Sequence, residues 1–215
     1  MAEVQLTRAQ LLRLGRQRMR SFGTFAAEAL SDYKTTAAVA PSSPYLAHAM
    51  LEPLRLSEGS TVVEFGPGTG VITRALLDLL PRDSTLLAFE INRRFYRYLR
   101  RSISDPRLVL LKKSAANVGR ELHRLGHKRV DAVVSSLGLG LMSDRERRSL
   151  LGALLPFMDE ESVFTQYQYF HGMEIKDGKL RRFSVGSLLR QYFDSVERKM
   201  VWRNLPPAFV FACRK

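Results

Sequence analysis

The sequence predicts an α/β fold in which a seven-stranded, mostly parallel sheet carries helices on both faces. From about residue 59 onward, short apolar runs alternate with segments of helical periodicity, which is typical of consecutive β-α-β units. A glycine-rich segment at 66–70 follows the first of these runs and leads into a helical segment. The last two apolar runs are separated only by a short turn, which indicates that the sheet closes with an antiparallel pair.

Each element follows from a local signal. Apolar runs predict the strands, which are expected at 61–65, 85–91, 108–112, 130–135, 162–169, 196–203 and 208–214. Helical periodicity predicts the helices between them, which are expected at 71–80, 93–102, 117–125, 143–155 and 185–192. Pro81 ends the first of these helices, and Ser143 is a suitable N-cap for the fourth.

Residues 1–58 precede this pattern and are expected to form a helical region of their own, with 59–215 as the α/β domain. At about 100° per residue, many apolar side chains of the opening segment fall on one broad face. These are Val4, Leu11, Leu12, Leu14, Met19, Phe22, Phe25 and Ala26. Arg13, Arg16 and Arg20 gather opposite. A basic amphipathic helix is typical of membrane-surface segments, although a helix that packs on the domain is the alternative.

Composition limits the possible functions. The 215 residues carry a net charge of +13, which indicates a polyanionic partner, either nucleic acid or an anionic membrane surface. We expect neither a signal peptide nor a transmembrane helix, because the chain lacks a signal-like start and any run of about 20 apolar residues. Cys213 is the only cysteine, so we expect no internal disulfide, no metal site built on cysteines and a cytoplasmic location.

The segment 64–70 carries the strongest functional signal. Gly66, Gly68 and Gly70 allow a tight turn and a close approach of the backbone to a ligand. The helix that follows adds backbone donors at its start. Glu90 lies at the end of the next expected strand, where a carboxylate can accept both hydroxyls of a ribose. The segment therefore predicts a site for a nucleoside-containing cofactor.

Two details favour S-adenosylmethionine over a dinucleotide. The dinucleotide pattern G-x-G-x-x-G requires a third glycine where this chain has Val71. Glu64 precedes the first glycine, and its carboxylate would repel a pyrophosphate but stabilise the cationic methionine end of S-adenosylmethionine. A plain tight turn without a ligand is the alternative.

The run at 62–76 resembles motif I of class I methyltransferases, and is especially similar to bacterial phospholipid N-methyltransferases and ribosomal RNA adenine dimethyltransferases. Three more stretches are similar to the lipid enzymes: Val-Ala-Pro-Ser-Ser at 39–43, Val-Val-Ser-Ser-Leu at 133–137 and Val-Trp-Arg-Asn-Leu-Pro-Pro-Ala at 201–208. The resemblance implies a Rossmann-like class I methyltransferase fold, with the helical region 1–58 as a cap toward the membrane or substrate.

The resemblance also implies which residues contact the cofactor. These are Glu64, Gly66, Pro67, Gly68, Thr69, Gly70, Glu90, Ile91, Asn92, Ser114, Ala115, Ser135, Ser42, Ser43 and Tyr33. For Tyr33, which would cap the cofactor, a surface position is the alternative. The chain lacks the acidic residue that the family usually places after the third strand, so backbone groups or the Ser114 hydroxyl would hold the adenine.

Ser135, Tyr167 and Tyr169 are the candidate catalytic residues, and Tyr167, Tyr169 and Arg203 the candidate substrate-binding residues. Ser135 ends the fourth expected strand and would orient the amine or the cofactor. Tyr167 and Tyr169 share one face of a strand and would line a headgroup pocket, with sheet packing as the alternative for one of them. Arg203 would meet a lipid phosphate, with a solvated surface role as the alternative.

The segment after the fourth strand favours lipid over RNA. The RNA dimethyltransferases carry Asn-Leu-Pro-aromatic there, whereas this chain reads Ser-Ser-Leu-Gly at 135–138. The Asn-Leu-Pro-Pro run at 204–207 lies before the last strand and is not that motif. Gly138 also departs from the lipid branch, in which a proline is expected.

We therefore expect an S-adenosylmethionine-dependent N-methyltransferase that acts on the amine of phosphatidylethanolamine, with further methylations toward phosphatidylcholine as an option. The alternatives are an RNA adenine N-methyltransferase, an enzyme for another amino lipid such as an ornithine lipid, and a non-catalytic basic binding module. The expected partners are an anionic membrane surface and a phospholipid, with nucleic acid less favoured and no metal. The expected location is the inner face of the cell membrane, with peripheral attachment from the cytoplasm. The sequence leaves the oligomeric state open.

Overall fold

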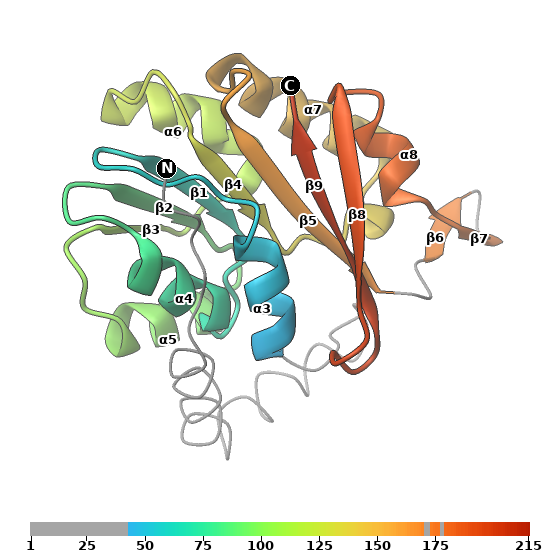
Figure 1. The fold of residues 1–215 in the computed structure, drawn as a ribbon, viewed down its shortest axis with the longest axis horizontal. Helices are drawn as coiled ribbons and strands as arrows, with labels where there is room; N and C mark the ends of the chain where they lie inside the picture. The colour runs from blue at the N-terminus through green and yellow to red at the C-terminus, as the bar shows by residue number, and fades with distance from the viewer. Residues whose placement is uncertain (1–42, 170–172, 177–178) are drawn as a thin grey trace.

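A computed structural model of the chain describes residues 43–169, 173–176 and 179–215, with the backbone alone given at 173–176 and 179–182. A seven-stranded sheet with the order β3-β2-β1-β4-β5-β9-β8 forms the centre of this part of the chain (Figure 1). Its strands are β1 (Thr61–Phe65), β2 (Thr85–Phe89), β3 (Leu108–Leu111), β4 (Ala132–Ser135), β5 (Val163–Tyr169), β8 (Ser195–Val201) and β9 (Ala208–Arg214). The first five are parallel, and β9 lies antiparallel between β5 and β8.

Helices cover both faces of the sheet (Figure 1). One face carries α3 (Pro44–Leu51), α4 (Val71–Leu79) and α5 (Arg93–Ser102), and the other carries α6 (Val118–Leu125), α7 (Asp144–Leu154) and α8 (Val185–Leu189). Three short 3-10 helices lie in the connections: η1 (Ala115–Asn117), η2 (Leu139–Leu141) and η3 (Leu155–Phe157). The predicted fold class, a mostly parallel seven-stranded sheet between helices, is confirmed.

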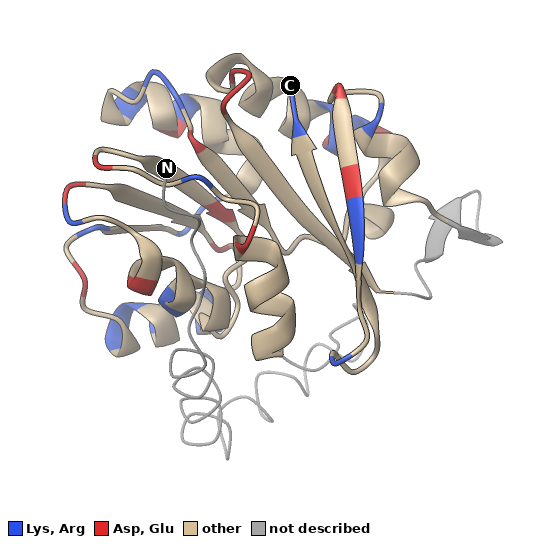
Figure 2. Cartoon of the chain, viewed as in Figure 1, with Lys and Arg blue, Asp and Glu red and all other residues tan. Residues whose placement is uncertain are grey.

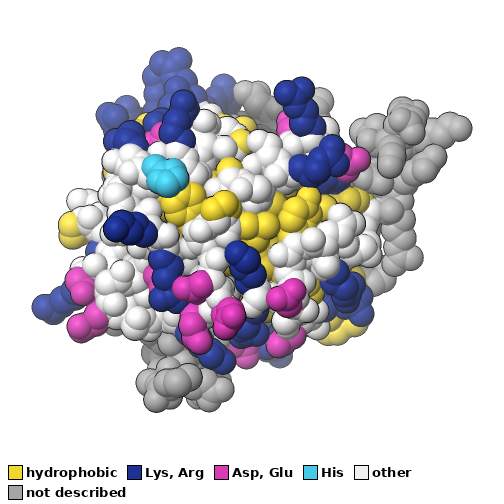
Figure 3. Space-filling model, turned by 90° about the horizontal axis from the view of Figure 1, so that it is seen from above, with side chains coloured by type: hydrophobic (Ala, Val, Ile, Leu, Met, Phe, Trp, Pro, Cys, Tyr) yellow, Lys and Arg dark blue, Asp and Glu magenta, His cyan; other side chains and the backbone are white. Residues whose placement is uncertain are grey.

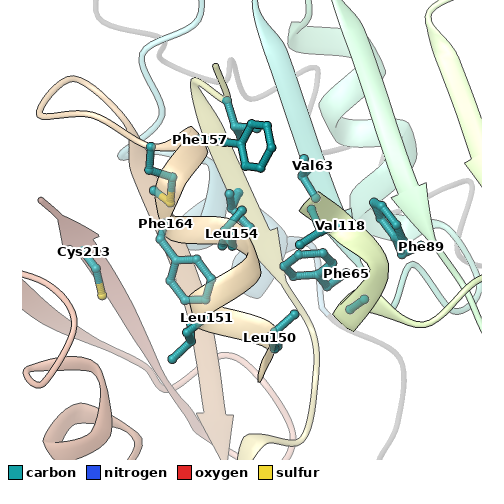
Figure 4. Packing of buried hydrophobic residues seen from close by; sticks show 14 of the residues in the cluster. Val63, Phe65, Phe89, Val118, Leu150, Leu151, Leu154, Phe157, Phe164 and Cys213 are labelled. Carbon is teal, nitrogen blue, oxygen red and sulfur yellow. The ribbon is translucent and has the colours of Figure 1, made fainter. Parts of the chain in front are cut away.

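Strand alternation builds one apolar cluster on each face of the sheet. On the face of α6 and α7, Phe65 and Phe164 pack with Leu151 (Figure 4). On the other face, Val62 and Val134 pack against α3 and α4. Because β1 is fully buried, the one charged residue in it, Glu64, is buried as well, on the face of α3 and α4.

Local sequence signals fix the ends of several helices. Ser143 caps α7 in a reciprocal capping box with Glu146, as predicted for the N-cap. Ser43 caps α3, and its hydroxyl accepts a hydrogen bond from the Leu46 N–H at 3.1 Å. Gly126 ends α6 in the left-handed conformation. The helix boundaries therefore follow the residues whose side chains or backbone freedom satisfy the open ends.

Several strands are shorter than predicted. β2 ends at Phe89 rather than at 91, because Glu90 turns its carboxylate to the backbone N–H groups of the loop. β8 ends at Val201 rather than at 203, because a turn begins there. A two-stranded sheet of β6 (Met173–Lys176) and β7 (Lys179–Arg182) was not expected. The sequence carries a hairpin signal that the prediction overlooked, because Met-Glu-Ile-Lys alternates apolar and polar residues and is followed by Asp-Gly at 177–178.

The amphipathic helix expected near the N-terminus lies outside the described residues. The division at residue 58 stays a prediction for the same reason. Of the first 58 residues the structure describes α3 and the loop after it, and α3 packs against β5, β8 and β9 and buries Leu46, Met50 and Leu51. Figure 2 marks Lys and Arg positions on α5 and on β8, whereas α3 contains neither Lys nor Arg.

Candidate active site

The carboxyl ends of the parallel strands bring the predicted site residues to one edge of the sheet. Strand order reverses between β1 and β4, and open α/β sheets bind ligands at such a point. The hydrogen-bond ladder continues into the loops, because the Gly66 N–H donates to Phe89 O at 3.0 Å and the Ser136 N–H donates to Phe65 O at 2.9 Å. The loops after β1, β2 and β4 are therefore fixed side by side.

The glycine loop has the conformation that its sequence predicts. Gly66, Gly68 and Gly70 have φ values of 72°, 55° and 78°, which non-glycine residues rarely adopt. A Cβ on Gly70 would lie 2.5 Å from the Leu99 side chain, whereas a Cβ on Gly68 would have no atom within 4 Å. The backbone at Gly68 is thus open to a ligand, while Gly70 packs closely against α5.

Glu64 is fully buried, and among the described residues neither of its carboxylate oxygens has a hydrogen-bond partner. Burial, with a smaller contribution from the nearby Glu90, raises its pKa from 4.5 to about 8. The Thr73 hydroxyl lies close enough to oppose this rise in pKa but makes no hydrogen bond of ordinary geometry. A buried acid without a partner fits a cationic ligand group, such as the methionine end of S-adenosylmethionine.

Glu90 joins two loops of the site. Its Oε2 atom accepts from the Gly68 N–H at 3.0 Å, and its Oε1 atom accepts from the Asn92 N–H at 2.7 Å. Burial raises the pKa of Glu90, and the backbone N–H groups that bond to it oppose the rise. Glu90 therefore holds the glycine loop against the loop after β2, while each oxygen keeps a lone pair for a ribose hydroxyl.

Arg74 supports the glycine loop, although the sequence did not single it out. Its Nη1 atom donates to Thr69 O and to Gly70 O, both at 3.0 Å, and its Nη2 atom donates to Ser102 Oγ at 2.8 Å. The position one turn into the helix after a glycine loop was the signal that could have identified it, because a long side chain there reaches back to the loop carbonyls.

Ser135 lies at the end of β4, next to a residue that sequence reasoning missed. Ser135 is paired with Gln166 of β5, and both side chains are fully buried on the face opposite Glu64. Gln166 Nε2 donates to Leu137 O at 2.9 Å and to Tyr167 O at 2.7 Å. Its Oε1 atom has no hydrogen-bond partner among the described residues. A buried amide oxygen of this kind is available to an N–H donor.

Tyr167 and Tyr169 lie together, as predicted, but on the other face of the sheet from Ser135. Their rings make an edge-to-face contact with centroids 5.3 Å apart, and both pack against the cluster under α3 and α4. Burial and the neighbouring Tyr167 raise the pKa of Tyr169. The structure thus brings the two tyrosines to the face of Glu64, and Ser135 does not share that face.

Two stretches similar to the lipid enzymes meet in space. The Ser43 N–H donates to the buried Asn204 Oδ1 at 3.0 Å, and Asn204 Nδ2 donates to Pro206 O at 2.7 Å. Arg203 stacks on the Tyr45 ring, with its guanidinium carbon 5.1 Å from the centroid. The turn between β8 and β9 is therefore attached to the start of α3, and Arg203 is placed on an aromatic ring there.

The remaining predicted cofactor residues lie around the glycine loop or beyond the described part of the chain. Ile91 is exposed and Asn92 caps α5. The Ser114 hydroxyl caps η1 by accepting from the Ala116 N–H at 3.3 Å, which leaves its O–H free to donate. Ser42 and Tyr33 lie outside the described residues. Within the described ranges, no three His, Cys, Asp or Glu side chains are grouped to hold a metal ion.

Comparison with known proteins supports the cofactor assignment. Residues 42–119 match the family described as ribosomal RNA adenine dimethylase. This match spans α3, the glycine loop and Glu90, and it ends before β4. The match therefore covers the cofactor half of the sheet.

Two relatives differ in how much of the chain they match. The ornithine lipid N-methyltransferase of Singulisphaera acidiphila is 26% identical over 204 residues, covering 91% of this chain and 97% of the relative. The ribosomal RNA small subunit methyltransferase A of Thiobacillus denitrificans is 37% identical over 87 residues, which are 38% of this chain and 33% of that protein.

A solved structure confirms the fold. Precorrin-6y C5,15-methyltransferase from Geobacter metallireducens superposes with a TM-score of 0.59 at 14% identity, covering 86% of this chain and 95% of the other. Together the fold, the glycine loop and these matches define the chain as a class I methyltransferase that takes S-adenosylmethionine as its cofactor. Of the two relatives, the ornithine lipid enzyme is similar along nearly the whole of both chains.

Proposed function

We propose that the chain methylates the amine of a membrane amino lipid, with phosphatidylethanolamine or an ornithine lipid as the acceptor. The observation that carries this proposal is the full-length similarity to an ornithine lipid N-methyltransferase, which includes the strands after β4. In this fold the loops that follow β4 and β5 select the acceptor, whereas the first half of the sheet holds the cofactor. A similarity that extends over both halves therefore supports the acceptor class as well as the cofactor.

RNA is the second candidate acceptor, and the matches that favour it are confined to part of the chain. The family of RNA adenine dimethylases matches residues 42–119, and methyltransferase A matches only 87 residues. Both lengths are too short to cover the chain from the glycine loop through β9. Ser-Ser-Leu-Gly at 135–138 also lacks the Asn-Leu-Pro-aromatic motif of those enzymes. Lipid is therefore the better supported acceptor.

The residues of the site divide the chemical work. S-adenosylmethionine supplies a methyl group on a sulfonium, which an uncharged amine nitrogen can take in an in-line displacement. Glu64 and Glu90 would hold the methionine and ribose ends of the cofactor. Gln166 Oε1 would accept a hydrogen bond from the acceptor amine and so orient its lone pair. Ser135, beside Gln166, would orient the same amine.

Aromatic side chains suit an amine that becomes bulkier and cationic with each methylation. Tyr167 and Tyr169 would line the route of the headgroup to the carboxyl edge of the sheet, where the two faces meet and where β4 ends at Ser135 beside Gln166 of β5. Arg203, stacked on Tyr45 at the same edge, would contact the anionic group of the lipid. Peripheral attachment to the inner face of the membrane goes with this role. Among the described residues, no helix combines the length and apolar character that crossing a bilayer requires.

A labelling experiment tests the proposal. Purified protein with methyl-labelled S-adenosylmethionine is incubated with vesicles that contain phosphatidylethanolamine, with vesicles that contain an ornithine lipid, or with total RNA. We expect label in one or both lipid arms, and the arm that takes label identifies the headgroup. Label in RNA with none in either lipid would contradict the proposal. Glu64→Gln is the control, because it removes the cofactor contact without altering the surface.

A further inference from the structure

The large hydrophobic side chains that are strongly exposed in the described part of the chain lie at the carboxyl edge of the sheet. Among the described residues, the exposed large hydrophobic side chains are Tyr45, Ile91, Leu141, Trp202 and Leu205. Tyr45 begins α3, Ile91 follows β2, Leu141 follows β4, and Trp202 and Leu205 lie in the turn between β8 and β9. All five positions lie at the edge where the parallel strands end, around the opening of the cofactor site.

Topology places the β8–β9 turn at this edge. β9 runs antiparallel to β5, and its first residue, Ala208, is paired with Tyr169 at the end of β5. The turn before Ala208 therefore projects where β5 ends. In Figure 1 this turn and the start of α3 lie together at the lower edge of the molecule. The exposed fractions are 72% for Trp202 and 82% for Leu205, so neither side chain contributes to the core.

The turn has a fixed backbone conformation, because the buried Asn204 side chain is hydrogen-bonded within it. Asn204 accepts from the Ser43 N–H and donates to Pro206 O, which fixes the backbone between the two exposed apolar side chains. A fixed turn that exposes a tryptophan and a leucine cannot hide them by refolding locally. Such exposure indicates a surface that another apolar phase covers.

Basic side chains accompany the apolar ones. Among the described residues at this edge, the exposed cations are Arg93, Arg94, Lys112, Arg145 and Arg203. The exposed acids there are Asp144, which pairs with Arg147, and Glu146, which bonds to Ser143. The opposite edge shows acidic and basic side chains together around a band of apolar surface (Figure 3). Its exposed acids are Glu58, Asp83, Asp159, Glu160, Glu161 and Asp194. The two edges of the sheet thus differ in the way that one-sided contact with an anionic bilayer requires.

We infer that the carboxyl edge inserts into the headgroup layer of an anionic bilayer, with Trp202 and Leu205 as its deepest side chains and Arg203 at phosphate level. Tryptophan and tyrosine prefer this interfacial zone because their rings are both apolar and polar. Insertion would bring the cofactor site to the membrane surface, so a lipid headgroup could enter without leaving the bilayer. The inference rests on the proposed lipid function but concerns the surface, not the reaction.

The chain carries its own reporter, since Trp202 is its only tryptophan. The full chain is titrated with vesicles of phosphatidylglycerol and phosphatidylcholine whose acyl chains carry bromine. Neither lipid offers a free amine, so the test is independent of methylation. We expect Trp202 emission to shift to shorter wavelength and to be quenched by the brominated chains. Unchanged Trp202 emission from vesicle-bound protein would overturn the inference. An emission shift without quenching would overturn it too, because Trp202 would then not reach the acyl chains and the membrane-contacting surface would lie in another part of the chain.

Charge variants provide a matched comparison. Arg203→Ser and Lys128→Ser remove the same charge from opposite edges, and both residues are exposed. We expect Arg203→Ser to lower the vesicle partition constant about fivefold, the effect of one basic residue at an anionic surface, and Lys128→Ser to leave it nearly unchanged. Leu205→Ser keeps the tryptophan and should lower partitioning several-fold. Equal effects of the two charge variants would contradict the inference.

The outcomes separate this inference from the proposed function. Quenching of Trp202 without label in either amino lipid would leave the inserted edge standing and remove the proposed reaction. Label in an amino lipid without quenching would keep the reaction and remove the inserted edge. Quenching by added RNA in place of brominated lipid would overturn the inference in favour of a nucleic-acid surface.

Discussion

At the scale of a single residue, Glu64 couples cofactor binding to the release of a proton. The free protein holds this carboxyl with a pKa of about 8, because the side chain is buried without a hydrogen-bond partner among the described residues. A cationic ligand group would lower that pKa, so binding near neutral pH releases a proton.

The affinity for S-adenosylmethionine should therefore depend on pH. Since the free pKa is about 8 and the bound pKa lies lower, we expect the association constant to rise with pH, by up to about tenfold per unit, and to level off above about pH 8. Calorimetry in buffers of different ionisation enthalpy measures both the affinity and the proton release. Glu64→Gln should bind more weakly and without this slope. A flat profile for the native chain would contradict the assigned role.

The same carboxyl should lower the stability of the ligand-free protein as pH rises. Its pKa is raised in the folded state, so its contribution to the free energy of unfolding is complete below about pH 4.5 and is lost as pH rises through about 8. Glu64→Gln has no such titration and should gain stability relative to the native chain between pH 5 and 8. Thermal unfolding of both proteins over that range checks this, and a constant difference would refute it.

Gly68 and Gly70 should respond differently to substitution by alanine. Gly70→Ala places a methyl group 2.5 Å from Leu99 and 2.7 Å from Arg74 Nη1, at a φ of 78°. Besides the left-handed backbone cost of about 1–2 kcal/mol, it displaces the side chain that supports the loop. Gly68→Ala carries the same kind of backbone cost at a φ of 55° but meets no atom within 4 Å, so it should lose less stability than Gly70→Ala and should also lower cofactor affinity. Denaturant unfolding and calorimetry separate the two, and a larger stability loss for Gly68→Ala would be the contrary result.

The cofactor-binding residues in the loops could be predicted from the sequence. The spacing of the glycines limits the backbone conformation, and the carboxylate that follows limits which ligand can bind. Gln166 could not be predicted, because its side chain bonds to the backbone carbonyl of Leu137, 29 residues away in the sequence. Arg74 was overlooked, although its position one turn after the glycine loop lets its side chain reach the nearby Gly70 carbonyl.

Ser135, Tyr167 and Tyr169 were predicted as one catalytic set, and strand alternation places Ser135 on the face opposite the two tyrosines. Successive residues of a strand point to opposite faces of the sheet. Knowing that a residue lies at the end of a strand therefore does not say which face its side chain occupies.

At the scale of elements, the β8–β9 turn contacts the start of α3. Both segments resemble the lipid enzymes in sequence, but the sequence did not predict that they are in contact. Asn204 is buried and bonds to both Ser43 and Pro206. The resemblance of 201–208 to the lipid enzymes therefore coincides with a structural joint between segments 161 residues apart.

Cutting this joint should loosen the carboxyl edge. Asn204→Ala leaves the Ser43 N–H without its partner, and we expect a loss of about 1–3 kcal/mol in the free energy of unfolding. Because α3 also packs through Leu46 and Met50, the fold should persist. Denaturant titration measures the loss, with Asn117→Ala as a control at a half-buried helix start whose side chain makes no capping hydrogen bond. An effect no larger than that of the control would show that the joint is not stabilising.

Elements with a periodic apolar pattern were predictable, and those without one were not. The limits of α5 and β9 agree with the sequence pattern, because apolar and capping residues coincide there. The β6–β7 pair was missed, although Asp-Gly at 177–178 between two short runs is typical of a hairpin. Strand ends such as that of β2 depend on side-chain bonds across loops, which periodicity does not encode.

At the scale of the whole molecule, the alternation of strands and helices was enough to predict the sheet, and the net charge of +13 indicated an anionic partner. Neither could assign the acceptor, because lipid and RNA enzymes share this fold and this sign of charge. The acceptor depends instead on which surface meets the partner.

The amphipathic segment at the N-terminus should add to membrane attachment. Deleting residues 1–30 removes several arginines and one broad apolar face, so we expect weaker flotation with anionic vesicles. The purified deletion variant and the full chain are compared on phosphatidylglycerol vesicles, with the secondary structure content of the variant as the control for folding. Unchanged flotation would remove the membrane role assigned to that segment.

The central claim is that the acceptor is a lipid amine. In the most direct measurement, the full chain and labelled S-adenosylmethionine are incubated with amino-lipid vesicles and total RNA in one reaction. The label is then followed into the organic and aqueous phases. We predict that the label enters the lipid phase, that mass spectrometry finds the added methyl on the headgroup amine, and that Glu64→Gln loses most of the signal. Label recovered in RNA, with the lipid phase unlabelled, would contradict the account.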